Sequence, residues 1–479
     1  MSAHLELLPG LRLSPLAPRR PRPPLAAVPV ERAADPVEEA ALRFGAVAAT
    51  AVHPFEVAAA IEAEGMSDRQ VQHRYGRVDA FQLAEDLYAD TPRSYPEPEQ
   101  APSPWSAPLS RSLLRGVLYA LPGLAFPLAG PLFAGPADAC GLPHGAFALA
   151  LSVLVHWAWN QALAHRTHTW LGRGGSRAAA RCLLLGTGTG VILGWGAAVL
   201  AALLWERGSA GVLLFCLAQS CSMAFSCVLL VLGRESVLLR ALAPGALCGA
   251  AVLLGLLRPS PLTSALLLLS LALTCREALR ELSVLRGRGA PEAGWSGAAV
   301  DPVPPLRASL PHGLFGVAMS LLTLGVAVHA GRIDPAPTVA LTVSMGPAEW
   351  LLYGYRDRVH GALRLARTVR GFALLSAGSV LVGLGSYLGV LAVLSGAMVA
   401  ATAGDGLGRQ LPALLALGAA LWTALLLQAT GALWAAIGVC LPAALAAVAG
   451  VAEGLVGTVA AALLLLIACR TLGRVTVHR

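Results

Sequence analysis

From residue 113 to the end of the chain, long apolar runs follow one another with only short polar breaks. A helix needs about 20 apolar residues to cross the hydrocarbon core of a bilayer. Twelve runs are present, at 113–134, 145–164, 182–204, 210–232, 241–257, 261–275, 311–330, 336–355, 371–395, 410–428, 433–450 and 454–469. Only 13% of the residues are charged, against about 25% in a soluble domain. These features predict an all-α, polytopic membrane protein with about 12 transmembrane helices.

Arginine is concentrated on one side of the predicted bundle. The loops after spans 2, 4, 6 and 8 carry Arg166, Arg173, Arg177, Arg181, Arg234, Arg240, Arg276, Arg280, Arg286, Arg288, Arg307, Arg356, Arg358, Arg364, Arg367 and Arg370. The opposite loops carry only Arg207, Arg258, Arg332 and Arg409. Because cytoplasmic loops are enriched in Arg and Lys, we expect a multi-pass protein of the cell membrane with both termini in the cytoplasm.

The longest break between runs, 276–310, divides the spans into two sets of six. We call residues 113–275 lobe 1 and residues 311–479 lobe 2. The positions that correspond at an offset of 190 residues are Leu151–Val153 with Leu341–Val343, Ala158 with Ala348, and Arg166 with Arg356. An even number of spans per lobe makes the two lobes parallel repeats, a plan typical of transporters. Chance alignment of helices rich in Ala, Gly and Leu is the alternative explanation.

Glu349 is the clearest ionisable side chain inside a predicted span. It follows a Gly-Pro step, Gly346-Pro347, which frees backbone groups and is tolerated where a helix faces protein or a wet cavity. A charge in a span costs at least ~2.5 kcal/mol, so such a residue is a functional candidate. We expect Glu349 to exchange protons with a cavity, or else to make a structural bond to a neighbouring helix.

The corresponding segment of span 2 carries His156, Trp159 and Asn160. His156 and Asn160 are four residues apart and share one helix face. With Trp159 and the Trp350 of span 8 as flat apolar surfaces, they are candidates to line a substrate and proton pathway together with Glu349. Polar residues that join helices to one another are the alternative interpretation.

Arginines at the predicted cytoplasmic ends of spans 2 and 8 are candidate headgroup ligands. Arg166, Arg356 and Arg358 would attract the anionic headgroup of a membrane lipid or of a lipid-linked saccharide. The topology rule explains the same arginines without any ligand.

The residues before the first span have a different character. We expect a disordered Pro/Arg tail over 1–36, a small cytoplasmic helical module over 37–90 and a Pro-rich linker over 91–112. Residues 31–100 hold 14 acidic side chains against 6 arginines, a net charge of −8. This charge repels phosphate and excludes nucleic acid as a partner, so the helix–turn–helix spacing of the module favours protein docking or self-association.

The module is expected to contain four helices, at 37–52, 54–64, 68–75 and 80–88. Ser67 and Gln70 form a capping-box pattern, and Gly65 and Gly76 are placed to end helices. The apolar side chains expected in its core are Phe55, Ala58, Ile61, Val71, Tyr75, Phe81, Ala84 and Leu87.

Motifs of enzyme chemistry are missing. The chain contains no lysine, which excludes a P-loop, and it contains neither HExxH nor GxSxG. Its nine cysteines form no CxxC pair. We therefore expect no enzyme activity, no metal and no cofactor.

Two segments resemble a family of actinobacterial integral membrane proteins: His53–Ala84, with His53-Pro54-Phe55 and Phe81-Gln82-Leu83-Ala84, and Met345–Tyr353. The six-plus-six plan is in turn similar to the superfamily of multidrug, oligosaccharidyl-lipid and polysaccharide exporters, which includes flippases. This resemblance implies a role in assembling cell-envelope glycans.

The main hypothesis is a transporter or flippase that moves an anionic lipid-linked saccharide by alternating access. A scaffold that recruits biosynthetic partners through residues 37–90 is the alternative. A membrane glycosyltransferase would need a carboxylate cluster, whereas the acids of the opposite loops, Asp138, Glu206, Asp334 and Asp405, are scattered.

Overall fold

The computed structural model describes residues 36–94, 108–137, 142–205, 209–287, 304–329, 332–333, 335–402 and 406–478. They form two compact units, a small one within 36–94 and a large one within 108–478. The predicted tail up to residue 35, most of the linker and the four acids of the opposite loops lie outside the described residues.

The small unit consists of four helices: α1 (Pro36–Thr50), α2 (Pro54–Ala63), α3 (Asp68–Tyr75) and α4 (Ala80–Asp90). The predicted capping box is confirmed, since the Ser67 amide donates a 2.8 Å hydrogen bond to Oε1 of Gln70. Gly76 ends α3 in the left-handed conformation, with φ of +70°. Local sequence signals therefore set the helix ends here.

Two of the eight residues predicted for its core are on the surface instead. Phe55 and Phe81 are 59% and 47% exposed, whereas Ile61 and Leu83 are fully buried. At 100° per residue, each ring lies about a third of a turn away from the buried face of its helix. The expectation that both rings lie in the core is therefore wrong.

The large unit contains a helix for each of the twelve predicted runs. The first is α5 (Leu109–Ala120), which continues through η1 (Leu121–Ala125), α6 (Phe126–Ala129) and η2 (Gly130–Phe133). The others are α7 (Ala146–Gly172), α8 (Ser176–Leu204), α9 (Ala210–Val231), α10 (Glu235–Leu253), α11 (Pro261–Gly287), α12 (Leu310–Ala327), α13 (Pro335–Leu365), α14 (Val369–Thr402), α15 (Gly406–Ala429), α16 (Leu433–Val448) and α17 (Glu453–Leu472). Short 3₁₀ turns, η3 (Leu306–Ala308) and η4 (Val475–His478), and a pair of two-residue strands, β1 (Val328–His329) and β2 (Arg332–Ile333), complete it.

Ten helical segments of the described chain are long and apolar enough to cross a membrane. The remaining two are α16, which is shorter, and α13, which carries Glu349, Arg356 and Asp357. The all-α, polytopic class is confirmed, with ten apolar spans rather than twelve. The helix α11 ends at Gly287, twelve residues beyond the end of the predicted run, and its last turns bury Ala278 and Leu282.

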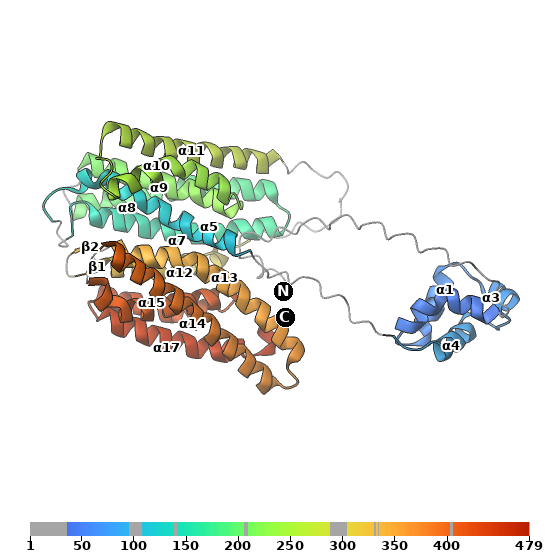
Figure 1. Ribbon diagram of the computed structural model, residues 1–479. Coiled ribbons are helices and arrows are strands. Elements are labelled where there is room, and N and C mark those ends of the chain that lie inside the picture. The colour runs from blue at the N-terminus through green and yellow to red at the C-terminus, as the bar shows by residue number, and fades with distance from the viewer. Residues whose placement is uncertain are drawn as a thin grey trace. The chain divides into compact units, whose positions relative to one another are not determined.

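The helices pack in two groups (Figure 1). The pairs of neighbouring helices correspond between the two groups. In the first six, α7 packs on α8, α8 on α9, α9 on α11, α10 on α11 and α5 on α10. At the equivalent places in the last six, α13 packs on α14, α14 on α15, α15 on α17, α16 on α17 and α12 on α16. The neighbours of each helix in the first group therefore correspond to those in the second.

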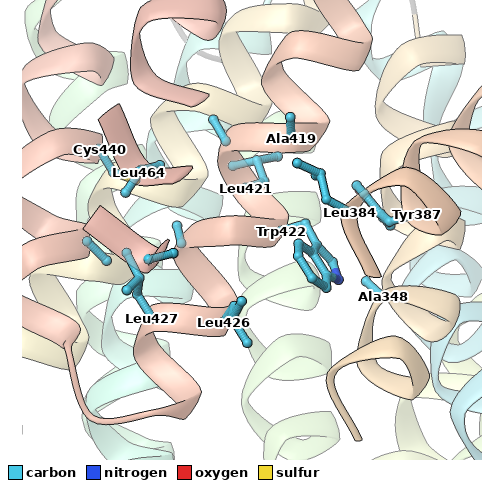
Figure 2. Packing of buried hydrophobic residues seen from close by; sticks show 14 of the residues in the cluster. Ala348, Leu384, Tyr387, Ala419, Leu421, Trp422, Leu426, Leu427, Cys440 and Leu464 are labelled. Carbon is cyan, nitrogen blue, oxygen red and sulfur yellow. The ribbon is translucent and has the colours of Figure 1, made fainter. Parts of the chain in front are cut away.

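Lobe 2 has an apolar core of its own around Trp422 of α15 (Figure 2). The indole is fully buried and stacks on the ring of Tyr387 of α14, with the ring centroids 6.3 Å apart. Leu384 and Ala348 lie close by, so that α13, α14 and α15 share this core. A large buried ring of this kind holds three helices in one packing arrangement.

Candidate functional site between the lobes

The two lobes meet at two helix crossings, where α5 packs on α13 and α7 packs on α12. In the order of the twelve predicted spans, these pairs are helix 1 with helix 8 and helix 2 with helix 7. Helices 1 and 2 of lobe 1 correspond to helices 7 and 8 of lobe 2, so replacing each helix by its counterpart turns the first pair into the second. The two crossings are thus equivalent positions in the pairing pattern.

Small residues let the backbones approach closely at both crossings. A Cβ atom added to Gly116 of α5 would lie 2.7 Å from the carbonyl oxygen of Val343 on α13, and Gly346 is beside it. A Cβ atom added to Gly316 of α12 would lie 2.8 Å from Cα of Ala158 on α7. Close contact between small residues is the usual means of joining helices in a bilayer.

Arg115, the neighbour of Gly116, connects the lobes by ion pairs. Its side chain is 3% exposed, and its Nε and Nη2 donate to Oε1 of Glu235 at 3.0 and 2.6 Å. Its Nη1 donates to Oε1 of Glu349. Since Glu235 belongs to α10 of lobe 1 and Glu349 to α13 of lobe 2, one guanidinium holds a carboxylate from each lobe. We call Arg115, Glu235 and Glu349 the interlobe triad.

The positions of the three groups follow from their helices. Glu235 is the first residue of α10, where the positive end of the helix dipole stabilises a carboxylate. Arg115 is in the second turn of α5, and Glu349 lies two residues after the proline of the Gly-Pro step in α13. Buried charges of this kind are costly unless they are paired, and they mark functional sites in membrane helices.

A pair of histidines lies at the second crossing. The rings of His165 on α7 and His312 on α12 are stacked 3.8 Å apart, and Nδ1 of His165 is 3.1 Å from Oγ of Ser309. Both lie at the bundle end where α5 begins, because α7 ends and α12 begins there. Polar contacts between the lobes are therefore present on this side at both crossings.

Glu349 makes a structural bond to a neighbouring helix, which is one of the two roles considered for it above. The other residues predicted to line the pathway are not in contact with it. His156 is buried against Gly190 and Gly194 of α8. Trp159 donates from Nε1 to the carbonyl of Gly186 at 2.7 Å, and Asn160 donates to the carbonyl of Met223 in α9 at 3.4 Å.

These three side chains thus face the interior of lobe 1 and do not join Glu349. The face of α7 that meets α12 carries Ala158 and Gln161 instead. Trp350, next to Glu349, is 40% exposed on the surface of the large unit.

The three candidate headgroup arginines have different surroundings. Arg166 is half-buried and donates from Nη1 to the carbonyl of Pro304 at 2.8 Å. Arg356 is buried and donates to the carbonyl of Ala429, at the end of α15. Only Arg358 is exposed. Arg356 therefore joins two helices of lobe 2, and its guanidinium is not open to a headgroup.

Neither Arg115 nor Glu235 was among the site residues predicted from the sequence, although the sequence contains a signal for Arg115. Arg115 lies inside the first predicted run, 113–134, and the rule that selected Glu349 applies equally to it. Glu235 precedes its predicted run, which was placed at 241–257, because α10 begins six residues earlier.

Each lobe also contains a small pocket at an equivalent place. The pocket of lobe 1 lies between η1, α9, α10 and α11 and includes Gln219 and Ser270. The pocket of lobe 2 lies between α12, α15, α16 and α17 and includes Gln410 and Glu453. Neither is lined by the interlobe triad, so within the described residues these two pockets are separate from it.

No protein-family model matches the sequence, and no curated protein matches it. One solved structure, "Inward-facing conformation of a multidrug resistance MATE family transporter of the MOP superfamily", is 13% identical and aligns over 75% of this chain and 92% of that chain, with a TM-score of 0.38. Another, "Crystal structure of MATE in the bent conformation", is 14% identical over 76% of this chain and 91% of that chain, with a TM-score of 0.31.

Proposed function

We propose that this protein is a secondary membrane transporter whose two six-helix lobes rock against each other, and that the interlobe triad controls the movement. The observation that carries the proposal is the ion pair between Arg115 of lobe 1 and Glu349 of lobe 2 beside the close contact of Gly116 with Gly346. An ion pair buried between two bodies favours one arrangement of them until it is neutralised.

The charges of the triad suggest how a proton would be coupled to opening. Two carboxylates face one guanidinium, so the triad carries a net charge of −1 when both are ionised. If the lobes separate, Arg115 keeps Glu235 and leaves a neutral pair in lobe 1, while Glu349 loses its partner. An unpaired carboxylate inside the bundle is costly, and a proton on Glu349 would remove its charge and so that cost. Protonation would thereby favour the separated state.

For the cargo, we propose an anionic, lipid-linked saccharide. The support is the arginine-rich side of the bundle, where Arg358 is exposed and where both interlobe crossings have their polar contacts. A phosphate-containing headgroup binds arginine clusters through charge-assisted hydrogen bonds. We assign this side to the cytoplasm by the arginine rule, which places both termini there.

The test is transport in proteoliposomes that contain a fluorescent polyprenyl-phosphate sugar, measured at several pH values. We expect Glu349→Gln to abolish the pH dependence of headgroup translocation. The matched control is Glu281→Gln, which removes the 2.9 Å ion pair between Glu281 of α11 and Arg234, outside the interface between the lobes, and should leave the pH profile unchanged. Full, pH-dependent transport by Glu349→Gln would refute the coupling role.

A membrane scaffold is the second candidate, favoured by one observation: the small unit folds around a core of its own and still exposes two aromatic rings. Deleting residues 36–94 would abolish the cellular function of a scaffold, whereas a transporter would retain translocation in proteoliposomes.

A further inference from the structure

The exposed side of the small unit carries an apolar surface that its own core does not use. The aromatic patch, as we call it, consists of Phe55 and Phe81, which are 59% and 47% exposed. Val52 and Val78, each three residues before one of the rings, are 71% and 68% exposed. The rings of Phe55 and Phe81 meet edge to face, with centroids 5.7 Å apart. Because α2 packs on α4, the patch is continuous across both helices.

The core of the unit is complete without these side chains. Phe44, Ile61, Tyr75, Leu83 and Leu87 are all at most 2% exposed. Exposed aromatic rings cost solvation free energy, and a contiguous apolar patch on a small domain is typical of an interaction site. Folding alone therefore does not account for the patch.

The net charge of the small unit is negative. The described part of the unit has ten acidic side chains and five arginines. Three of these arginines are already paired with acids, Arg43 with Glu64, Arg74 with Glu39 and Arg77 with Asp86. Exposed acids lie on the same helices as the rings, Glu62 two turns from Phe55 on α2 and Glu85 one turn from Phe81 on α4.

We propose that the aromatic patch is a docking site for a basic amphipathic helix of a protein partner. The apolar side of such a helix would cover the rings, and its Arg or Lys side chains would reach Glu62 and Glu85. The acidic surface disfavours the other occupants: a second copy would bring acid against acid, and an anionic membrane or a nucleic acid would be repelled. The inference does not depend on the proposed transport activity.

The first test measures binding to the full chain in nanodiscs of zwitterionic lipid. The probe is a synthetic 18-residue helix with leucine on one side and arginine on the other, and the reference probe has glutamate in place of arginine. We expect the basic peptide to bind at least tenfold more tightly than the acidic one, with empty nanodiscs as the blank.

Variants identify the surface that binds. Phe55→Ala and Phe81→Ala should each lower the affinity for the basic peptide about tenfold, as removal of a central aromatic contact does. Glu62→Gln with Glu85→Gln keeps the rings and should also weaken binding. The control is Leu42→Ala, a change at a 76% exposed apolar residue of α1 outside the patch, which should have no effect.

Equal binding of both peptides, or binding that survives both phenylalanine changes, would overturn the proposal. A photo-crosslinking amino acid at position 81 provides the cellular test. Crosslinks to a basic, amphipathic segment of another protein are expected. Crosslinks to a second copy of this chain or to lipid, or no crosslink, would overturn the inference, and none of these results bears on translocation in proteoliposomes.

Discussion

Arg115 is the residue that connects the two lobes electrostatically. Its guanidinium is buried and shared between two carboxylates, and the pair with Glu235 stays within lobe 1. Both carboxylates compensate the burial of Arg115, and under the proposed rocking movement the bond to Glu349 is the one that would break. This division of roles leads to different expectations for the three residues.

Arg115→Ala should lower the stability of the protein by about 3–5 kcal/mol, because it leaves two carboxylates buried without their partner. Thermal unfolding followed by the fluorescence of the ten tryptophans measures the change. Arg111→Ala, one turn earlier at an exposed position of the same helix, should stay within about 0.5 kcal/mol. Equal effects of the two changes would contradict the role of Arg115.

Trp422→Ala should destabilise lobe 2 by about 3–5 kcal/mol, since it removes the fully buried ring on which α13, α14 and α15 converge. The same thermal assay tests it. Trp434→Ala is the matched control, because that ring is 64% exposed. A comparable loss of stability from both tryptophans would show that the core around Trp422 does not hold these helices.

Among the candidate site residues, sequence reasoning could select Glu349 but not its surroundings. A carboxylate in an apolar run is visible in the sequence, and so is Arg115. Which neighbour each helix face meets is decided by packing between distant segments. His156 and Asn160 therefore contact α8 and α9 respectively, and not Glu349.

At the scale of elements, the distance between α5 and α13 is set by glycine. Gly116 and Gly346 let the two backbones touch, and this contact brings Arg115 within hydrogen-bonding reach of Glu349. The close approach and the ion pair should therefore depend on each other.

Gly116→Ala tests this dependence. The added Cβ atom would meet the Val343 carbonyl oxygen at 2.7 Å, so α5 and α13 must move apart, at a cost of about 1–3 kcal/mol. Gly188→Ala on α8 is the control, because its Cβ would have nothing within 4 Å, and it should be neutral or slightly stabilising. If the Gly116→Ala and Gly188→Ala variants unfold at the same temperature, the packing of α5 on α13 does not depend on the close contact at Gly116.

The positions of the helices could be predicted well, because runs of apolar residues and local caps are properties of short segments. All twelve runs became helices, and the Ser67–Gln70 cap lies where its spacing placed it. Ends without such signals were less predictable. The helix α11, for example, extends to Gly287, whereas the apolar run that predicted it ends at residue 275, because a helix can continue into a polar segment that hydropathy does not reveal.

At the scale of the whole membrane unit, the same pairing of helices occurs twice, and the two crossings between lobes exchange when the lobes are exchanged. The small pockets also lie at equivalent places in both lobes. We interpret this as an internal repeat around an axis between the lobes. Such an arrangement allows two rigid bodies to rock about their contact.

The most direct test of the account is the distance between the lobes on the side of the triad. This distance can be measured by double electron–electron resonance between spin labels at Val284 of α11 and Leu365 of α13. Both residues are exposed near helix ends on that side. We predict that Glu349→Gln adds a population with a longer distance than the wild type, and that Glu281→Gln, which breaks the ion pair between α11 and Arg234, does not. Identical distance distributions for the wild type and Glu349→Gln at every pH would contradict it.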